Sequence, residues 1–309
     1  MPDRGKTQAF LCNKIEMLAT LYGTPQQFNG LTQPIPQVRS GIVTLLTDFG
    51  LADYFVGAMK GVILSRFSQA ILVDITHIIP PHDIRAAAFT LYAAYRCFPA
   101  GTVHLVVVDP GVGSDRRPVI VESSDHLFVG PDNGVFSLVL SKSGNAKVRQ
   151  ITNRAYFLPN VSTTFHGRDL FSPVAAALAQ GTAPDLLGPI IPNPVRFDVS
   201  QNQVTKEGAI LGSVIHIDHF GNCVTSFACD EVNIDWGRHA FCLWVKGIAI
   251  RKLLRYYQEA SADAREPFLI IGSAGHLEIS VARSSAAREL NVAVGEPVVL
   301  VPSVPLCEA

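Results

Sequence analysis

Apolar runs alternate with helical stretches over the first two thirds of the chain. Runs rich in β-branched residues at 42–47, 70–75 and 103–108 predict buried strands, and the stretches 54–66 and 84–96 between them predict helices. Strands that alternate with helices are typical of βαβ units, in which the strands pair in parallel. This pattern predicts an α/β domain with a mostly parallel sheet.

The same region continues with shorter elements. Two brief apolar runs at 119–122 and 127–129, separated by a polar turn, indicate a hairpin. Residues 169–179 predict a further helix, with Gly181 as its stop signal. The two prolines within 190–198 then suggest a linker.

Helices become scarce after this linker. Short strands separated by Gly, Asn and Asp turns are expected at 210–217, 223–227, 240–245, 268–271, 277–281 and 297–301. They predict a smaller all-β, barrel-like domain. We therefore expect an α/β domain at 41–195, which would carry the chemistry, and a β domain at 205–305.

Residues 1–40 differ from the rest of the chain. They are rich in Gln, Pro and Gly and show little periodicity, although 14–22 could form a short helix. We interpret this segment as an extension or a mobile arm.

Composition excludes several classes of protein. The 309 residues include 25 Lys and Arg against 26 Asp and Glu, so the basic excess that binds nucleic acid is missing. A content of 48% hydrophobic and 17% charged residues excludes a disordered chain and suggests surface hidden in a large core or between subunits.

Location is also suggested by the sequence. The chain contains no run of about 20 apolar residues, as a membrane span requires, and its first residues lack the apolar region of a secretory signal. The six cysteines form no CxxC pair and do not suggest a disulfide framework. We expect a cytoplasmic protein with reduced cysteines.

Two aspartates follow predicted parallel strands. Asp48 ends the run 42–47 and Asp109 ends the run 103–108, and glycines follow both. Ligands of open α/β sheets bind outside the carboxyl ends of the strands. Two aspartates at one edge therefore favour a site, although each alone could cap a helix or stabilise a turn.

Two further residues could join this site. A loop that contains glycine separates Asp109 from Arg116 and can fold back so that the two side chains pair. His166 precedes a predicted helix, whose N-terminal dipole would favour the neutral imidazole. A surface histidine followed by a helix-capping Asp169 is the alternative interpretation.

A metal site is the natural competitor. Asp74, His77, His82 and Asp83 lie close together, but they lack HxH or HExxH spacing and a double proline stiffens the segment. We therefore expect no metal. Neither GxGxxG nor GxxxxGK[ST] occurs, so neither a dinucleotide nor a nucleoside triphosphate is implied.

The second domain offers polar loops. Asp218 and Asn222 lie between two predicted strands, where a carboxylate and an amide could bind a polar small molecule. Residues 273–276 form another loop of small residues. Each loop alone could be no more than a turn.

Taken together, these motifs resemble a known family. The sequence is similar to the S-adenosyl-L-methionine (SAM) hydrolases that form adenosine, also called SAM hydroxide adenosyltransferases, which are relatives of fluorinases and chlorinases. The resemblance rests on TDFGLADYFVGAMKGVI (47–63), DITHIIPPHDI (74–84), FPAGTVHLVVVDPGVGSDRR (98–117), VGPDNGVFS (129–137), TTFHGRDLFSPVAA (163–176) and IDHFGNCVT (217–225).

The resemblance implies a fold, an assembly and a reaction. Family members have a larger α/β domain and a smaller β domain, and they are typically homotrimers with the substrate between domains of neighbouring subunits. The implied reaction is hydrolysis of SAM to adenosine and L-methionine by water attacking ribose C5′, with SAM as substrate and no cofactor.

The resemblance also assigns roles to residues. The family's Asp–Arg–His triad falls on Asp109, Arg116 and His166. The family's substrate contacts fall on Asp48 for the ribose hydroxyls, Asp218 and Asn222 for the methionine end and nearby ribose or base groups, and Ser273 for methionine.

Differences from the halogenases bear on the nucleophile. Halogenases lack the aspartate at position 109 and have Trp and Arg where this chain has His82 and Ala274, so contacts at those two positions are left open. Fluorinases place a serine at the position of Gly167 and carry an insertion that is absent from 117–128. Water is therefore the expected nucleophile. A halogenase-like enzyme, a trimeric sensor that binds SAM or adenosine without turnover, and a metal-dependent hydrolase are the alternatives.

Overall fold

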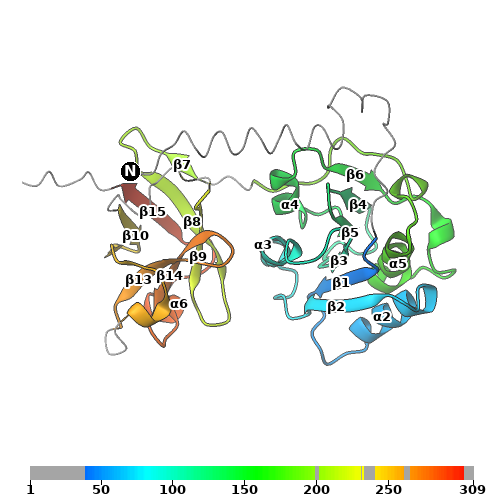
Figure 1. Cartoon of the computed structure of the whole chain (residues 1–309), viewed down its shortest axis with the longest axis horizontal. Coiled ribbons are helices and arrows are strands. Elements are labelled where there is room, and N and C mark those ends of the chain that lie inside the picture. Colours follow the sequence, from blue (N-terminus) through cyan, green and yellow to red (C-terminus); the bar gives the residue numbers. More distant parts are fainter. Residues whose placement is uncertain (1–38, 199–201, 231, 233–240, 261–264, 303–309) are drawn as a thin grey trace, which may run out of the picture. The chain divides into compact units, whose positions relative to one another are not determined.

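The computed structural model describes residues 39–198, 202–230, 232, 241–260 and 265–302. Their strands form two sheets, one of six strands and one of nine (Figure 1). The expected arm at 1–40, including the possible helix at 14–22, lies almost entirely outside these residues. Among the helices of the described part, none has the length and apolar character needed to cross a bilayer.

The six-stranded sheet has the order β2-β1-β3-β5-β4-β6. Strands β2, β1, β3 and β5 pair in parallel, and β4 is antiparallel to both of its neighbours. The predicted mostly parallel sheet is thus confirmed. Its strands are β1 (Ile42–Thr47), β2 (Ile71–Thr76), β3 (Val103–Val107), β4 (Pro118–Glu122), β5 (Leu127–Pro131) and β6 (Lys147–Gln150).

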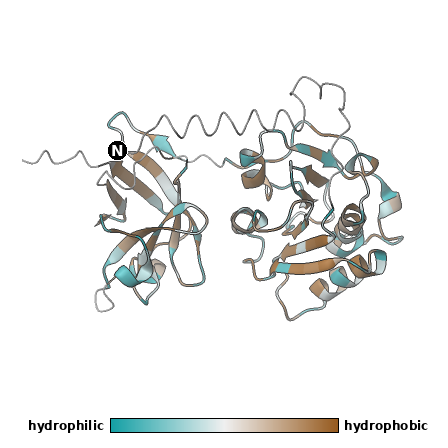
Figure 2. Ribbon diagram, in the orientation of Figure 1, coloured by the Kyte–Doolittle hydropathy of each residue, from teal (hydrophilic) through white to brown (hydrophobic). Residues whose placement is uncertain are grey.

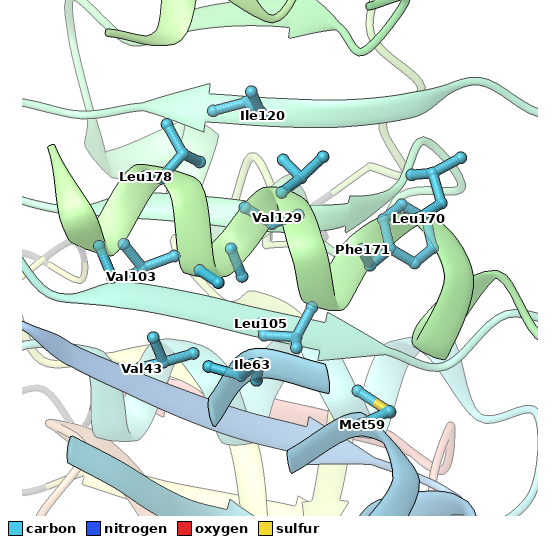
Figure 3. Close-up of a cluster of buried hydrophobic side chains, with 14 of the residues drawn as sticks. Val43, Met59, Ile63, Val103, Leu105, Ile120, Val129, Leu170, Phe171 and Leu178 are labelled. Carbon is cyan, nitrogen blue, oxygen red and sulfur yellow. The ribbon is translucent and has the colours of Figure 1, made fainter. Parts of the chain in front are cut away.

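Helices cover both faces of this sheet. On one face, α2 (Phe55–Arg66) and α5 (Ser172–Gln180) pack with side chains such as Val103 and Leu105 (Figure 3). On the other face, α3 (Ile84–Tyr95) and α4 (Ser137–Lys142) pack with alternate residues such as Val106. Because both faces are buried, the central strands are apolar throughout, which made them recognisable in the sequence.

The nine-stranded sheet is the predicted all-β part. Its order is β11-β10-β15-β8-β9-β14-β13-β12, with β7 paired to β8, and it curls into a half-barrel. Its strands are β7 (Gln203–Val204), β8 (Ile210–Ile217), β9 (Cys223–Ala228), β10 (Phe241–Val245), β11 (Ile248–Ile250), β12 (Leu253–Leu254), β13 (Pro267–Ile271), β14 (His276–Val281) and β15 (Pro297–Pro302).

Short elements escaped prediction from the sequence. Helix α4 and strand β6 were not expected, nor were β7, β11, β12 and the one-turn helix α6 (Ala286–Glu289). Each is too short for a periodic pattern to develop, and β6 (KVRQ) is mostly polar. These elements form through pairing and packing with the larger ones rather than through their own residues.

The edge strand β2 is apolar yet poorly covered. Figure 2 shows it in the same brown as the central strands, but Ile71 is 56% exposed. Ile78 just beyond it is 70% exposed, and Leu51 and Tyr54 before α2 are also exposed. Exposed apolar side chains of this kind, here Leu51, Tyr54, Ile71 and Ile78, are common at contacts between proteins.

One polar cluster lies inside the α/β core. His104 of β3 is fully buried, with Nδ1 2.8 Å from Thr44 Oγ1 and Nε2 3.2 Å from His126 Nδ1. Burial, followed by the neighbouring His126, lowers the pKa of His104 to about 3. The neutral imidazole therefore occupies the core.

This cluster predicts acid-sensitive stability. The unfolded chain would protonate His104 near pH 6.5 whereas the folded chain would not until about pH 3, so stability should fall as the pH drops through this window. At pH 5 the cost is about 2 kcal/mol. Denaturant unfolding of His104→Gln at pH 7 and pH 5 should show a smaller loss between the two pH values than the unchanged protein shows.

Replacing the exposed His219 by Gln is the matched control and should leave the loss unchanged. Because each variant is compared with itself at two pH values, a general destabilisation by the substitution does not affect the result. An undiminished loss in His104→Gln would contradict the assignment.

Candidate active site

The ends of β1 and β3 bring two candidate aspartates to one edge of the sheet. These strands are parallel neighbours, with Thr47 opposite Val107. Asp48 and Asp109 follow at their carboxyl ends, as the sequence predicted, and both side chains are nearly buried. The amide of Asn133 donates to the carbonyl oxygen of Val108 at 2.9 Å and so fixes the end of the chain segment that leads into Asp109.

Asp109, Arg116 and His166 form one connected group. Arg116 Nε donates to both carboxylate oxygens of Asp109, at 2.9 and 3.0 Å, and its Nη2 also pairs with Oδ2. The same Nη2 lies 2.8 Å from His166 Nδ1. The predicted Asp–Arg pair is therefore present, and His166 joins it through the arginine.

Glycine makes this convergence possible. Gly113, with φ +80°, lies so close to the carbonyl oxygen of Thr163 that a Cβ atom there would overlap it. The loop that carries Arg116 is thereby packed against the segment that leads to His166. A left-handed backbone and a close approach of two chain segments both require glycine at this position.

Packing fixes the arginine from a second side. Its guanidinium carbon lies 5.1 Å from the centre of the Phe171 ring, and the Arg116 side chain is only 9% exposed. Phe171 ends the π-helix η3 (Gly167–Phe171), which directly follows His166 and continues into α5. The predicted helix at 169–179 thus begins as a wider turn that carries both His166 and Phe171.

The protonation state of His166 follows from its neighbour. Burial, followed by the charge of Arg116, lowers the pKa of His166. Because a guanidinium can only donate hydrogen bonds, Nδ1 must accept and the neutral ring carries its hydrogen on Nε2. A lowered pKa agrees with the neutral histidine expected from the sequence, and burial and Arg116 are causes that the sequence did not indicate.

Asp48 holds a strained segment of the neighbouring loop. Its Oδ2 accepts a hydrogen bond from the backbone N–H of His82 at 2.8 Å, and His82 has a positive φ of 68°. The His82 side chain itself is largely exposed, with Nδ1 4.0 Å from Asp48. The carboxylate therefore stabilises a backbone conformation that is uncommon for a residue other than glycine.

The alternative metal site does not assemble. His77 Nε2 lies 3.0 Å from Asp74, but Asp74 also pairs with Lys60 at 2.6 Å. His82 faces Asp48 instead, and Asp83 caps helix α3 through the N–H of Ala86. The described residues contain no group of three or more His, Cys, Asp or Glu side chains arranged to hold a metal ion.

A second polar group forms in the β part. Asp218 accepts hydrogen bonds from the backbone N–H of Asn222 and from its side-chain amide, both at 2.8 Å. Gly221, with φ +88°, lets this turn pack tightly against Ser285. The loop between β8 and β9 is therefore a preformed structure that presents both predicted residues together.

The structure adds residues that the sequence did not indicate. The Tyr257 hydroxyl lies 3.5 Å from the Asn222 amide and influences the pKa of Glu278 on β14. Ser273 is exposed in the turn before β14, next to Gly272, which packs against the Glu278 carboxylate. The available signal was the polar residues at alternate positions, His276, Glu278 and Ser280, within an apolar strand.

The two groups belong to different parts of the chain, one to each sheet. Asp109, Arg116 and His166 are joined by hydrogen bonds, and so are Asp218, Asn222 and Tyr257. Between described residues, no hydrogen bond, ion pair or ring contact joins the first group to the second, or either group to Asp48.

Comparison with known proteins covers both parts of the chain. A family model described as the SAM hydroxide adenosyltransferase N-terminal domain matches residues 43–188, and the corresponding C-terminal domain matches 212–299. The chain is 42% identical to an (R)-S-adenosyl-L-methionine hydrolase of Salinispora tropica over 58% of this chain and 69% of that protein.

Two further matches extend over most of the chain. An (R)-S-adenosyl-L-methionine hydrolase of Thermus thermophilus is 35% identical over 83% of this chain and 98% of its own length. The crystal structure of an uncharacterized conserved protein from Thermotoga maritima is 34% identical and superposes with a TM-score of 0.77, covering 84% of this chain and 99% of that one. With both of its sheets matched in this way, the chain belongs to the SAM hydroxide adenosyltransferase family.

Proposed function

We propose that this protein hydrolyses S-adenosyl-L-methionine to adenosine and L-methionine. The observation that carries the proposal is the connected Asp109–Arg116–His166 group, in a chain that matches the family in both domains. A relative named as a hydrolase of this substrate is 42% identical over 58% of this chain.

The reaction is mainly a problem of positioning. The sulfonium of the substrate leaves C5′ as the neutral thioether of methionine, so no acid is needed to assist the leaving group. A water molecule must be held on the face of C5′ opposite sulfur and must lose a proton as it attacks. We propose that the protein needs neither a metal nor another cofactor for this step.

The geometry suggests how the proton moves. Arg116 occupies the Nδ1 lone pair of His166, and Nε2 already carries hydrogen, so the imidazole has no free basic nitrogen. Asp109 Oδ1 accepts only one hydrogen bond from Arg116 and so retains a free lone pair. Asp109 would accept the proton, His166 would orient the water through Nε2–H, and Arg116 would fix Asp109 and stabilise negative charge on the attacking oxygen.

The other residues would bind the substrate. Asp48 would hold the ribose hydroxyls, since its carboxylate lies at the same edge of the sheet as Asp109. Asp218 would hold the methionine end, with Asn222 and Ser273 nearby. These residues belong to the β domain whereas the triad belongs to the α/β domain, and we propose a homotrimer in which the β domain of one copy completes the site of its neighbour.

Two observations support an assembly of this kind. Large apolar side chains are exposed to solvent in the single chain at Leu51, Tyr54, Ile71 and Ile78. The low charged content of the chain also fits surface that is buried between subunits. A cytoplasmic location stays a prediction from the sequence alone.

A halide nucleophile is less well supported by the site. A Cβ atom on Gly167 would lie 3.2 Å from Met59 Sδ and 3.3 Å from the Phe165 ring, so the serine that fluorinases carry there would require its neighbours to move. A proton acceptor such as Asp109 is useful to water and not to a halide ion. A sensor without turnover would have no use for the triad.

Substitutions in the triad should abolish product formation. Asp109→Asn, His166→Ala and Arg116→Lys should each lower the rate of adenosine release about 100-fold or more, because proton acceptance or alignment of the water is lost. Chromatography of adenosine and methionine after incubation with SAM measures the effect. Asp115→Asn, in the same loop but exposed, is the matched control and should keep full activity. Full activity in any two triad variants would refute the assignment.

Shared sites predict complementation between inactive variants. Three chains of 33.4 kDa should sediment as one particle, and Asp109→Asn and Asp218→Asn should each be nearly inactive alone. Mixed trimers from co-expression should recover about a quarter of normal activity, since one half of the α/β domains and one half of the β domains are intact. Recovery would be absent if each site were built from one chain.

A further inference from the structure

A cluster of polar side chains lies on the outer face of β14. Leu277 and Ile279 point into the core of the half-barrel, whereas the alternating Glu278 and Ser280 point away from it. Asp218 and Tyr257 approach these two residues from the β8–β9 loop and from the short helix η5 (Tyr257–Glu259). Glu278 is only 8% exposed, so its carboxyl group is buried within the cluster.

The cluster contains two carboxyl groups and lacks a cation. Neither Asp218 nor Glu278 forms an ion pair with any lysine, arginine or histidine in the described part of the chain. A buried carboxylate beside a second, partly buried one is costly without a cation, and a proton on Glu278 relieves the cost. Burial, followed by the charge of Asp218, raises the pKa of Glu278 to about 7.

The groups that surround Glu278 are few. Asp218 faces it from the β8–β9 loop and Tyr257 from η5, and the Tyr257 phenol has its own pKa raised by burial and by both carboxylates. On β8, His216 is influenced by the same Asp218. On β13, the residues paired with Glu278 and Ser280 are the apolar Ile270 and Phe268. His276 is the next residue on the same face of β14.

A separate observation indicates a ligand. The Ser280 hydroxyl is fully buried and has no hydrogen-bond partner within normal geometry, although it lies beside the Tyr257 phenol. Buried hydroxyl groups in folded proteins are almost always paired. A polar group that enters the cluster would supply the missing partner, and the surrounding charge requires that group to be a cation.

We propose that Glu278, together with Asp218, binds the α-ammonium group of the methionine end of the substrate and releases its proton when the substrate binds. This inference rests on the proposed function. The sulfonium, the other cation of SAM, is bonded to C5′ and so must lie at the triad. The ammonium is the cation that remains for the acidic cluster. Glu278 is thus a specificity-determining residue that discriminates in favour of an amino acid end.

The proposal fixes the direction of the pH dependence. Binding of a cation requires ionised Glu278, so substrate affinity should rise with pH until Glu278 is fully ionised. With a pKa of about 7 and about tenfold weaker binding by the uncharged form, the KM for SAM should fall about threefold between pH 6 and pH 7, a range in which the α-ammonium group keeps its charge. In Glu278→Gln the KM should be about tenfold higher than that of the fully ionised protein and nearly independent of pH, with little change in kcat. Glu266→Gln, which changes an exposed glutamate just before the neighbouring strand β13, should behave like the unchanged protein.

Two measurements separate binding from a merely structural role. Calorimetry of SAM binding to Asp109→Asn protein, in phosphate and in Tris at pH 7, should show release of about half a proton on binding. With adenosine present, the unchanged protein should bind L-methionine and discriminate against 4-(methylthio)butanoate, which lacks the amino group, whereas Glu278→Gln should not discriminate.

The outcomes distinguish this inference from the proposed function. If the unchanged protein forms no adenosine from SAM, the proposed function fails. If it forms adenosine but binding releases no proton, or Glu278→Gln keeps the pH dependence of KM and the preference for methionine, then only the role of Glu278 fails. The calorimetric measurement leaves Glu278 intact, so it decides the matter even if Glu278→Gln does not fold.

Discussion

The bidentate pair between Arg116 and Asp109 is the interaction on which the candidate site depends. A buried carboxylate would be unstable at this position without the guanidinium. Nη2 of the same guanidinium also contacts Nδ1 of His166. Since arginine only donates, this one residue fixes the position of Asp109 and the tautomer of His166 together. The close packing of Gly113 on Thr163 and the Phe171 ring then hold the guanidinium in place. Longer side chains or a looser loop would leave the same three residues present but unaligned.

The parallel sheet supplies the frame for this pair. β1 and β3 are neighbours with both faces buried, so their carboxyl ends are fixed relative to each other by the core. Asp48 and Asp109 directly follow these strand ends, so their positions are fixed as well. The loops that follow them can return to the site through short turns that contain glycine. The β part reaches a similar result by another route, because the turn of Asp218 and Asn222 is closed by its own hydrogen bonds.

Sequence patterns predicted these features unevenly, for physical reasons. The apolar strands and the Asp109–Arg116 pair could be predicted because burial on both faces and a short glycine loop are local properties. Helix α4 and strand β6 could not, since each owes its form to packing with larger elements. Glu278 was missed because its properties depend on residues that are distant in the sequence. A polar residue at an alternate position of a strand is ordinary, and its pKa changes only when folding buries it and places Asp218 and Tyr257 beside it.

The carboxylates of the triad and of the β part are stabilised in different ways. Asp109 has a permanent cation in Arg116, which balances the charge of its carboxylate within the folded chain. The Asp218 and Glu278 carboxyl groups have no cationic partner among the described residues. The repulsion between their charges is relieved when Glu278 binds a proton, as its raised pKa indicates. A cationic ligand is the one partner that removes the deficit without adding a residue to the core. An arginine in the second group, like the one in the first, would stabilise the two carboxylates in the free protein. It would also compete with a cationic ligand and weaken its binding. The lack of such an arginine is therefore an argument that the group binds a cation.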